Sequence, residues 1–459
     1  MRPWLARTVY RLQEAAVGRP SFAYLAALEK SQWLPRSELE ALQTRKLNRL
    51  LQAALAHSPW HAARLRGAGL AEQVRAGTMG IGDLARLPSM DKKDARTHVA
   101  ELVWHGVPGG AFRYNTGGSS GAPLIFHYGR ERQASDAAGR MRARRWWGVE
   151  AGEREAYLWG APVELSKTDR VKTLRDRLIN QLVLNAFAMS PARMDEYLAA
   201  LTAWQPRCLY GYASSVALLA AHAEARAIRP KLDRLKVVCT TGEPLYPHQR
   251  ALIGRVFGAP VANEFGSRDI GFTAHEAPDG ELLLMSESHV VEVLDAAGAP
   301  AAPGESGEAV ITGLTSLAQP FIRYRTGDVI KLAQAPDPGG RGLHVIAELS
   351  GRQTDFVVGE DGTLMHALAV IYVLRAVAGV EQFKCIQHSA LRMEVQVVPG
   401  PAWDEAARAA VVAGLKARLG ANVAVDVREM DGIPPEASGK HRYVVSRVEL
   451  AAELKQAAA

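Results

Sequence analysis

The stretch from Cys208 to Thr241, CLYGYASSVALLAAHAEARAIRPKLDRLKVVCTT, contains one complete strand–helix–strand unit. Residues 208–210 and 236–241 have the length and the apolar, β-branched composition of buried strands, and residues 214–227 between them have the apolar spacing of a helix. Strands that alternate with helices along a chain favour an α/β fold with parallel strands. We therefore predict α/β layers around this unit.

The same alternation extends outward over residues 110 to 350. Residues 156–159 and 260–263 predict two further strands, and residues 194–204 predict a helix. Between residues 281 and 332, strands come closer together and are broken by Gly/Pro turns. That spacing favours a more antiparallel, barrel-like piece within the large domain.

The two ends of the chain differ from this middle part. Residues 1 to about 100 predict helices, since Leu47, Leu50, Leu51 and Leu55 recur at helical spacing. Near the other end, strands at 382–388, 392–398 and 423–429 surround a helix at 404–419, the pattern of a small α+β domain. Because 459 residues are too many for one compact core, we predict a large domain over 1–350, mostly helical in 1–105, and a small domain over 351–459.

Composition excludes several classes of protein. Hydrophobic residues make up 48% of the chain and charged residues 22%, an ordinary balance for a chain that buries large cores. No apolar stretch approaches the length that crosses a bilayer, and no signal-like run follows Arg2 and Arg7. Cys208, Cys239 and Cys385 are far apart in the sequence, which fits a reducing compartment and disfavours a thiolate zinc site. We expect a cytoplasmic protein without a transmembrane segment.

The net charge of +7 is compatible with nucleic acid, anionic lipid or a phosphorylated small molecule as partner. The chain carries no recognised nucleic-acid module, so we expect no nucleic-acid partner. The densest basic cluster comprises six arginines and two tryptophans: Arg130, Arg132, Arg140, Arg142, Arg144, Arg145, Trp146 and Trp147. We interpret it as a solvated helix face with buried tryptophans, and the alternative is a rim that attracts a polyanionic cosubstrate.

The N-terminal segment is amphipathic, because Trp4, Leu5, Val9, Leu12 and Ala16 recur at helical spacing. A helix of this kind packs on its own domain or touches a membrane surface. We favour packing on the domain.

A loop of small residues and hydroxyls, YNTGGSSGAPL, spans residues 114–124. It clusters backbone N–H and hydroxyl donors, which suits the phosphates of a nucleotide. No Lys-Ser or Lys-Thr follows its last glycine, so it is not a Walker-type loop. Five motifs follow downstream: TTGEP at 240–244, NEFGSRDIG at 263–271, FIRYRTGD at 321–328, GRQTD at 351–355 and SGKHR at 438–442. Each of these motifs alone is a common turn sequence. Turn chemistry alone does not explain why all five occur in this order.

This ordered set resembles the adenylate-forming superfamily of acyl-CoA synthetases, peptide-synthetase adenylation domains and luciferases. The absence of a lysine after Pro123, the residue Arg268 and the segment HSPWH at 57–61 resemble its phenylacetate–CoA ligase branch, which includes CapK-like relatives from capsular-polysaccharide biosynthesis. The resemblance covers essentially the whole chain. It implies nucleotide and acyl binding by residues 106–350 and a mobile C-terminal lid domain over 351–459.

The resemblance implies a nucleotide site built from these motifs. The β- and γ-phosphates of ATP would be held by the loop residues Thr116, Gly117, Gly118, Ser119, Ser120 and Gly121. The adenine would be lined by Gly242, Glu243, Pro244, Asn263, Glu264, Phe265, Gly266 and Ser267. Asn263 would bond the adenine amino group, and Phe265 would stack on the purine. Asp328 would accept from the ribose hydroxyls, and Arg352 would contact the ribose or the α-phosphate.

The resemblance also implies the catalytic groups. Lys440, on a mobile loop, would meet the charge that develops as a carboxylate attacks the α-phosphorus, with Thr116 and Arg268 as further phosphate contacts. Asp269 stands at the acidic position that holds Mg²⁺. Tyr210, Gly211 and Tyr212 would line the acyl pocket, and the alternative for them is routine aromatic packing.

Residues 265–269 depart from the usual motif, because Phe-Gly-Ser-Arg-Asp replaces Tyr-Gly-x-Thr-Glu. Arg268 stands where a threonine normally touches the α-phosphate. Its guanidinium can bind that phosphate bidentately, and the alternative is that it remodels the site. The implied reaction joins a small-molecule carboxylic acid to AMP with release of pyrophosphate, and then transfers the acyl group to coenzyme A. Two alternatives stay open: an amine or a carrier-protein thiol as acceptor, and a nucleotide-binding scaffold without turnover. The motifs do not identify the acid or the oligomeric state.

Overall fold

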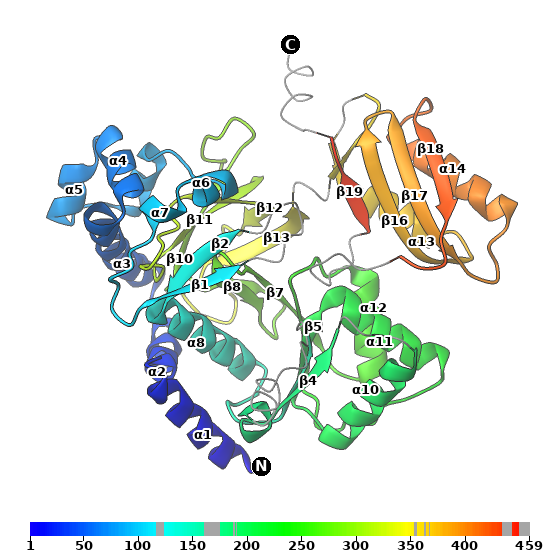
Figure 1. The fold of residues 1–459 in the computed structure, drawn as a ribbon, viewed down its shortest axis with the longest axis horizontal. Coiled ribbons are helices and arrows are strands. Elements are labelled where there is room, and N and C mark those ends of the chain that lie inside the picture. The colour runs from blue at the N-terminus through cyan, green and yellow to red at the C-terminus, as the bar shows by residue number, and fades with distance from the viewer. Residues whose placement is uncertain are drawn as a thin grey trace. The chain divides into compact units, whose positions relative to one another are not determined.

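The computed structural model describes residues 1–115, 124–159, 175–186, 189, 191–352, 356–361, 364–366, 368–433 and 443–448. The chain divides into two compact units (Figure 1). Unit 1 comprises Met1–Thr326 and Ile330–Leu349, and unit 2 comprises Gly327–Val329 and Ser350–Ala459. Within the described ranges, no helix combines the length and the apolar character that a bilayer crossing requires.

Unit 1 begins with a series of helices, as predicted. They are α1 (Pro3–Ala16), α2 (Ser21–Ser31), α3 (Arg36–His57), α4 (Pro59–Gly67), α5 (Ala71–Ala76), the 3₁₀ helix η1 (Ile81–Arg86), α6 (Lys92–Thr97) and α7 (Val99–Leu102). Leu47, Leu50 and Leu51 of α3 are fully buried, which explains their helical spacing in the sequence. A two-stranded hairpin, β1 (Ala111–Asn115) and β2 (Ile125–Gly129), follows these helices.

A sheet of eleven strands crosses unit 1 in the order β10-β11-β12-β13-β9-β8-β7-β6-β5-β3-β4. Its strands are β3 (Glu155–Trp159), β4 (Gln181–Asn185), β5 (Cys208–Tyr212), β6 (Val237–Thr241), β7 (Val261–Ser267), β8 (Gly271–Glu276), β9 (Leu282–Leu284), β10 (His289–Leu294), β11 (Ser306–Gly313), β12 (Tyr324–Leu332) and β13 (Val345–Arg352). The strands from β4 to β7 pair in parallel, as the alternation of strands and helices predicted. From β7 to β8 the pairing becomes antiparallel, because a short turn joins these two strands. The antiparallel strands expected as a barrel-like piece thus continue the parallel sheet.

Helices cover both faces of the parallel half. On one face lie α10 (Pro191–Trp204), α11 (Ala213–Ala225) and α12 (Pro247–Phe257), where Leu158, Leu209 and Val216 belong to one buried cluster. On the other face lies α8 (Arg130–Trp146), since Arg144 of α8 contacts the ring of Tyr210. Successive residues of a strand point to opposite faces of the sheet. Leu209 therefore faces the layer of α10, α11 and α12, and its neighbour Tyr210 faces α8.

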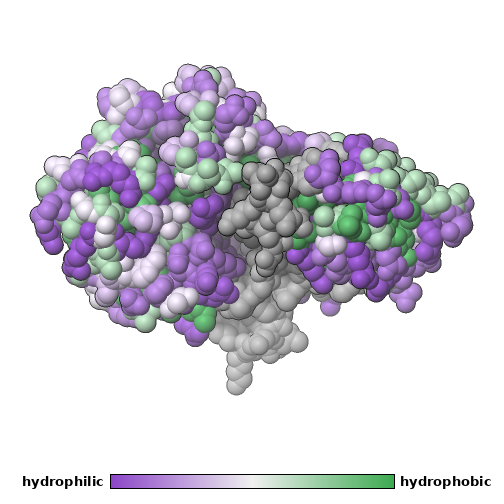
Figure 2. All heavy atoms as spheres, turned by 90° about the horizontal axis from the view of Figure 1, so that it is seen from above, coloured by the Kyte–Doolittle hydropathy of each residue, from purple (hydrophilic) through white to green (hydrophobic). Residues whose placement is uncertain are grey.

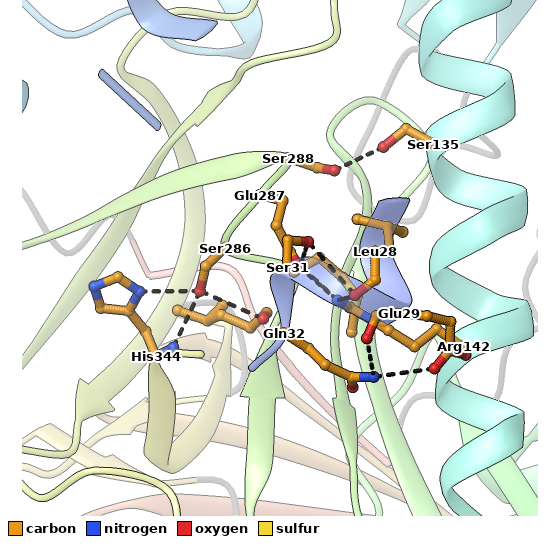
Figure 3. A network of polar contacts seen from close by, with 12 residues as sticks. Leu28, Glu29, Ser31, Gln32, Ser135, Arg142, Ser286, Glu287, Ser288 and His344 are labelled. Carbon is orange, nitrogen blue, oxygen red and sulfur yellow. Dashed lines mark hydrogen bonds and ion pairs between the residues drawn. The ribbon is translucent and has the colours of Figure 1, made fainter. Parts of the chain in front are cut away.

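The structure corrects the interpretation of the six arginines of α8 as a solvated face. Arg132, Arg142 and Arg144 are buried, and Arg142 is 0% exposed. Nη1 of Arg142 lies 2.5 Å from Oε1 of Glu287, which also accepts from the hydroxyl of Ser31 at 2.7 Å (Figure 3). Burial alone raises the pKa of Glu287, but Arg142 outweighs it and the pKa lies below its ordinary value. Residue spacing shows which arginines share a face, but it does not show which carboxylates cover that face.

The two tryptophans at the end of α8 are partly buried, as predicted. The indole N–H of Trp146 donates to Oε1 of Gln32 at 2.9 Å, and that of Trp147 donates to the carbonyl of Glu276 at 2.9 Å. The end of α8 is therefore tied to the end of α2 on one side and to β8 on the other.

Unit 2 contains a four-stranded sheet in the order β18-β17-β16-β19 and a separate hairpin of β14 and β15. Its elements are β14 (Phe356–Val358), β15 (Leu364–His366), α13 (Leu368–Arg375), β16 (Val380–Ser389), β17 (Arg392–Pro399), α14 (Glu405–Leu419), β18 (Ala424–Glu429) and β19 (Val444–Ser446). Asp404 begins α14, because its carboxylate accepts from the backbone N–H of Ala407 at 2.7 Å. The elements β16, β17, α14 and β18 match the strands and the helix predicted for this region, and β14, β15, α13 and β19 were not predicted.

Candidate nucleotide and acyl site

Two parts of the predicted site lie outside the described residues. They are the phosphate loop with Thr116–Gly121 and the segment with Lys440. Arg352 ends β13, and its side chain is also outside the described part of the chain. The remaining predicted residues lie on β5, β7 and β12 or in the turns that follow β6 and β7.

The turn after β6 holds Gly242, Glu243 and Pro244 at the edge where the parallel strands end. Gly242 has a φ of +74°, which favours glycine. Oε2 of Glu243 accepts from the backbone N–H of Ser214 at 2.9 Å, in the first turn of α11. A carboxylate at a helix N-terminus satisfies an otherwise unpaired donor and is favoured by the helix dipole. The Glu243 side chain thus fixes the turn to the start of α11. The backbone of Gly242, Glu243 and Pro244, and not this carboxylate, would line a ligand.

Asn263 of β7 has an unsatisfied acceptor. Its backbone N–H donates to Oε2 of Glu276 at 2.8 Å, while its side-chain Oδ1 is buried and has no hydrogen-bond partner within the described part of the chain. A buried acceptor without a partner costs about 1–3 kcal/mol. An incoming N–H donor would remove that cost.

Phe265, two residues later on β7, packs into a buried cluster that includes Phe126 and Ile270. Most of its ring is covered in this way. Gly266 follows at a register shift between β7 and β8, and a Cβ there would lie 2.4 Å from the carbonyl oxygen of Gly271. A side chain at this position would push the two strands apart, which is why the bulge requires glycine.

Glu264 points to the opposite face from Phe265 and joins three strands to α8. Its Oε1 accepts from the hydroxyl of Tyr210 at 2.8 Å and from that of Thr241 at 3.1 Å, and lies 4.0 Å from Nε of Arg140. Burial and the Glu264 carboxylate hold the pKa of Tyr210 well above its ordinary value, so this hydroxyl stays a neutral donor. The arrangement fixes the ends of β5, β6 and β7 relative to one another.

The predicted acyl-pocket residues have well-defined packing partners. Tyr212 stacks on Trp159 with ring centroids 4.4 Å apart and an interplanar angle of 19°. At Gly211 a Cβ would lie 2.7 Å from the carbonyl oxygen of Leu158, so the close approach of β5 to β3 requires glycine. Trp159 was predicted only as the end of a strand. Its apolar character gave no sign of this stacking, because the contact depends on β3 and β5 being neighbours.

The turn between β7 and β8 brings Arg268 and Asp269 together with side chains from four other elements: β1, β5, β12 and α8. The exposed Arg268 has its guanidinium carbon 5.8 Å from the ring centroid of Tyr114 on β1. Burial raises the pKa of the Tyr212 hydroxyl and Arg268 lowers it, with a net rise, which places Arg268 beside the end of β5. Arg268 therefore lies next to the strand that leads into the predicted phosphate loop.

Asp269 is buried and hydrogen-bonded. Its Oδ2 accepts from the hydroxyl of Tyr324 at 2.8 Å, and its Oδ1 accepts from the hydroxyl of Ser267. Arg132 of α8 donates to the carbonyl oxygens of Arg268 and Asp269 at 2.6 Å each. Arg132 was not predicted as a site residue, and the basic cluster was the only signal that pointed to it.

A magnesium ion at Asp269 fits this donor set only in part. No cluster of three or more histidine, cysteine, aspartate or glutamate residues that could hold a metal occurs within the described ranges. Because Mg²⁺ is commonly held by one or two carboxylates, substrate phosphates and water, Asp269 fits as a single protein ligand.

The structure also shows where Asp328 and the segment 57–61 lie. Asp328, the predicted ribose acceptor, is buried on β12. The segment 57–61 is a packing element: His57 stacks on Trp104 with centroids 3.8 Å apart, and Nε2 of the buried His61 lies 2.9 Å from the carbonyl oxygen of Pro320. Burial lowers the pKa of His61 to about 3, so its ring is neutral at pH 7.

The small unit and the whole chain both have recognisable relatives. Residues 357–447 match the family described as the CapK C-terminal domain. Protein CapK of Staphylococcus aureus is 22% identical over 382 residues, which cover 80% of this chain and 81% of the relative. Phenylacetate-coenzyme A ligase of Thermus thermophilus is 24% identical over 344 residues, covering 71% of this chain and 73% of the relative. The chain is a homologue of protein CapK and of phenylacetate-coenzyme A ligases.

The fold agrees with this homology. A crystal structure of 2-hydroxyisobutyryl-CoA ligase in the postadenylation state superposes with a TM-score of 0.69 at 20% identity, and the match covers 94% of each chain. The resemblance to adenylate-forming ligases and to their phenylacetate–CoA ligase and CapK branch is thereby confirmed. The predicted α/β fold with an α+β C-terminal part is confirmed as well.

Proposed function

We propose that the chain activates a small carboxylic acid with ATP and transfers the acyl group to coenzyme A, as a phenylacetate–CoA ligase does. One structural observation supports the proposed binding of ATP. The turn after β6 and the segment Asn263–Asp269 meet at the ends of adjacent parallel strands, where the buried Oδ1 of Asn263 has no donor among the residues that the structure describes. An adenine amino group supplies such a donor. Ligands of open α/β sheets bind outside the carboxyl ends of the strands, which supports this placement.

The proposed chemistry has two steps. In the first, an oxygen of the acid attacks the α-phosphorus of ATP, the bond from that phosphorus to the bridging oxygen breaks, and pyrophosphate leaves. Lys440 stabilises the charge that develops, and Arg268 contacts the α-phosphate. In the second, the sulfur of coenzyme A attacks the acyl carbon, the thiol proton goes to solvent, and AMP leaves. The phosphate loop Thr116–Gly121 holds the β- and γ-phosphates before the first step.

Mg²⁺ bound through Asp269 would neutralise phosphate charge. The chain itself positions that carboxylate. Tyr324 and Ser267 donate to the two carboxylate oxygens of Asp269, and Arg132 donates to the backbone carbonyl oxygens of Arg268 and Asp269. These contacts keep Arg268 and Asp269 in one orientation before any ligand arrives, which lowers the cost of reorganisation.

Acid-dependent ATP–pyrophosphate exchange tests the first step. The panel includes aromatic, short-chain and long-chain acids, and we expect exchange with at least one class. Asn263→Ala should raise the KM for ATP about tenfold, because one hydrogen bond to the base is lost. Asn422→Ala is the matched control, since Asn422 lies in unit 2 and bonds Glu360. A protein that binds ATP without exchange for any acid would be a nucleotide-binding scaffold, contrary to the proposal.

The acceptor is the second question. The match of residues 357–447 to the CapK C-terminal domain favours, as an alternative, an amine on a sugar or a peptide, or a carrier-protein thiol. Product mass after incubation with coenzyme A and then with candidate amines separates these acceptors. A thioester of coenzyme A supports the first proposal, and an amide formed in preference to it supports the alternative.

A further inference from the structure

The outer face of α1 is apolar and exposed. Trp4 is 63% exposed and Leu12 is 65% exposed, and Leu5 between them is also exposed. At 100° per residue, Trp4, Thr8, Leu12, Ala15 and Leu5 occupy one arc of about 100°. Five of the twelve large exposed hydrophobic residues among those described lie within residues 1–17. By contrast, hydrophilic residues cover most of the face of unit 1 in Figure 2, where apolar residues form small separate patches.

The exposure is not caused by a detached helix. The opposite side of α1 carries the buried Ala6 and Glu14, and Glu14 is bonded to Arg19 and to the hydroxyl of Ser21 at 2.5 Å. Near its start, α1 approaches the domain so closely that a Cβ on Gly152 would lie 2.5 Å from the carbonyl oxygen of Pro3. The helix lies along the edge of unit 1 beside α2 (Figure 1). Its apolar arc is therefore held facing outward.

The charged side chains that flank this arc on α1 itself are basic, and one of them, Arg7, lies 3.8 Å from the exposed carboxylate of Glu150. On the helical wheel, Arg7 and Arg11 flank one edge of the arc and Arg2 flanks the other. The only acidic residue of α1 is Glu14, which is buried on the far side. The neighbouring segment 175–178 repeats the pattern: Leu178 and two arginines are exposed, while its acid Asp176 is buried. This segment adjoins α1, since the side chain of Asn180 donates to the carbonyl of Met1 at 3.0 Å.

We propose that α1 and residues 175–178 form a docking surface for an anionic lipid membrane. A held helix with Trp and Leu on its outer arc and arginines on both edges has the two properties that interfacial binding requires: apolar side chains enter the acyl boundary, and cations bind the headgroups. A second copy of the chain is the less fitting occupant, because two such surfaces would bring arginines against arginines. The surface would place the enzyme at a membrane without a transmembrane segment.

Vesicle co-sedimentation of the full chain tests this inference. Vesicles of phosphatidylcholine and phosphatidylglycerol in a 3:1 ratio are compared with phosphatidylcholine alone, at low and high NaCl. We expect binding to the anionic vesicles that weakens with salt. The double variant Trp4→Ser/Leu12→Ser should bind about tenfold more weakly because two inserting side chains are lost. Arg2→Glu/Arg177→Glu should lose most of the salt-dependent part. Leu391→Ser, which changes an exposed leucine in unit 2, is the matched control and should bind like the unaltered chain.

Sedimentation velocity and thermal unfolding complete the test. Since Trp4 and Leu12 are exposed, the double variant should keep the melting temperature of the unaltered chain, so that its weaker binding reports the surface. Failure of the unaltered chain to bind anionic vesicles would overturn the proposal, and so would equal binding by the double variant. A dimer that becomes monomeric in the double variant, without vesicle binding, would assign the surface to a second copy of the chain and equally contradict it. Loss of ATP–pyrophosphate exchange would bear on the ligase proposal but not on this one.

Discussion

Charged side chains are usually exposed and large apolar ones buried, but helices α8 and α1 show the opposite. The arginine-rich α8 buries Arg132, Arg142 and Arg144, whereas α1 buries Glu14 and exposes Trp4 and Leu12. The difference lies in what each helix meets. Helix α8 lies against a sheet and a helix that supply carboxylates and carbonyls, and α1 lies at an edge that supplies partners for one side only. The surroundings of a helix therefore decide which of its residues are buried, even when its periodicity is clear.

The largest expected effect concerns the buried pair of α8. Arg142→Met leaves the carboxylate of Glu287 buried without its cation, and we expect the free energy of unfolding to fall by about 3–5 kcal/mol. Denaturant unfolding followed by fluorescence measures it. The double variant Arg142→Met/Glu287→Gln should recover a large part of the loss. A change of less than about 1 kcal/mol in Arg142→Met would place this arginine in solvent and remove the contrast with α1.

The second effect is a pH dependence of the interior next to α8. Burial lowers the pKa of His275, which packs near Trp146, to about 4. Below the unfolded value of about 6.5 the unfolded chain binds a proton that the folded chain does not, so the unfolding free energy falls as the pH drops from 6.5 towards 4. This histidine contributes about 3 kcal/mol of that loss. His275→Gln should flatten the slope in this window, and His98→Gln, a control at a histidine whose side chain is 34% exposed, should leave it unchanged. An equal slope in both variants would contradict a buried neutral His275.

The third effect links α8 to the proposed nucleotide site. Arg132→Leu removes two charge-assisted hydrogen bonds to the turn that holds Arg268 and Asp269, and we expect kcat/KM for ATP to fall about 10- to 100-fold. The matched control is Arg145→Leu, because Arg145 lies on the same helix and forms its described ion pairs with the partly exposed Glu29 and the exposed Glu150. Equal activity of the two variants would mean that Arg132 does not position the turn.

The smallest expected effect is on the other helix. Trp4→Ser/Leu12→Ser should change the unfolding free energy by no more than about 0.5 kcal/mol, since both side chains are exposed. The same denaturant titration measures it. A loss of several kcal/mol would show that the outer arc of α1 is covered and that the two helices do not differ in the way described.

Much of the fold could be predicted because its signals are local. Residues 208–210 and 214–227 correspond to β5 and α11, and the predicted helix at 404–419 is α14 with Asp404 as its cap. What could not be predicted depends on contacts between distant segments. The pairing of Arg142 with Glu287 and the exposure of Trp4 follow from which elements lie side by side, and helical periodicity does not encode that.

Part of the candidate site could likewise be predicted from local signals in the sequence, and part could not. Gly242 was predicted at the end of a strand and lies in the turn after β6, whereas the strand predicted to end at Asn263 continues to Ser267. The roles of Arg132 and Trp159 were not predicted, because each acts on a strand or turn that is remote in the chain. The glycines show the physical reason for part of the pattern: at Gly211 and Gly266 a side chain would collide with a neighbouring strand.

The most direct test of the ligase account separates its two half-reactions in the variant Lys440→Ala. Pyrophosphate exchange measures adenylate formation, and conversion of a chemically prepared acyl-adenylate to the thioester of coenzyme A measures transfer. The account predicts that exchange falls about a hundred- to a thousandfold while transfer is largely kept, because the lysine stabilises charge at the α-phosphorus only in the first step. Equal loss of both half-reactions, or exchange at the rate of the unaltered chain, would contradict it.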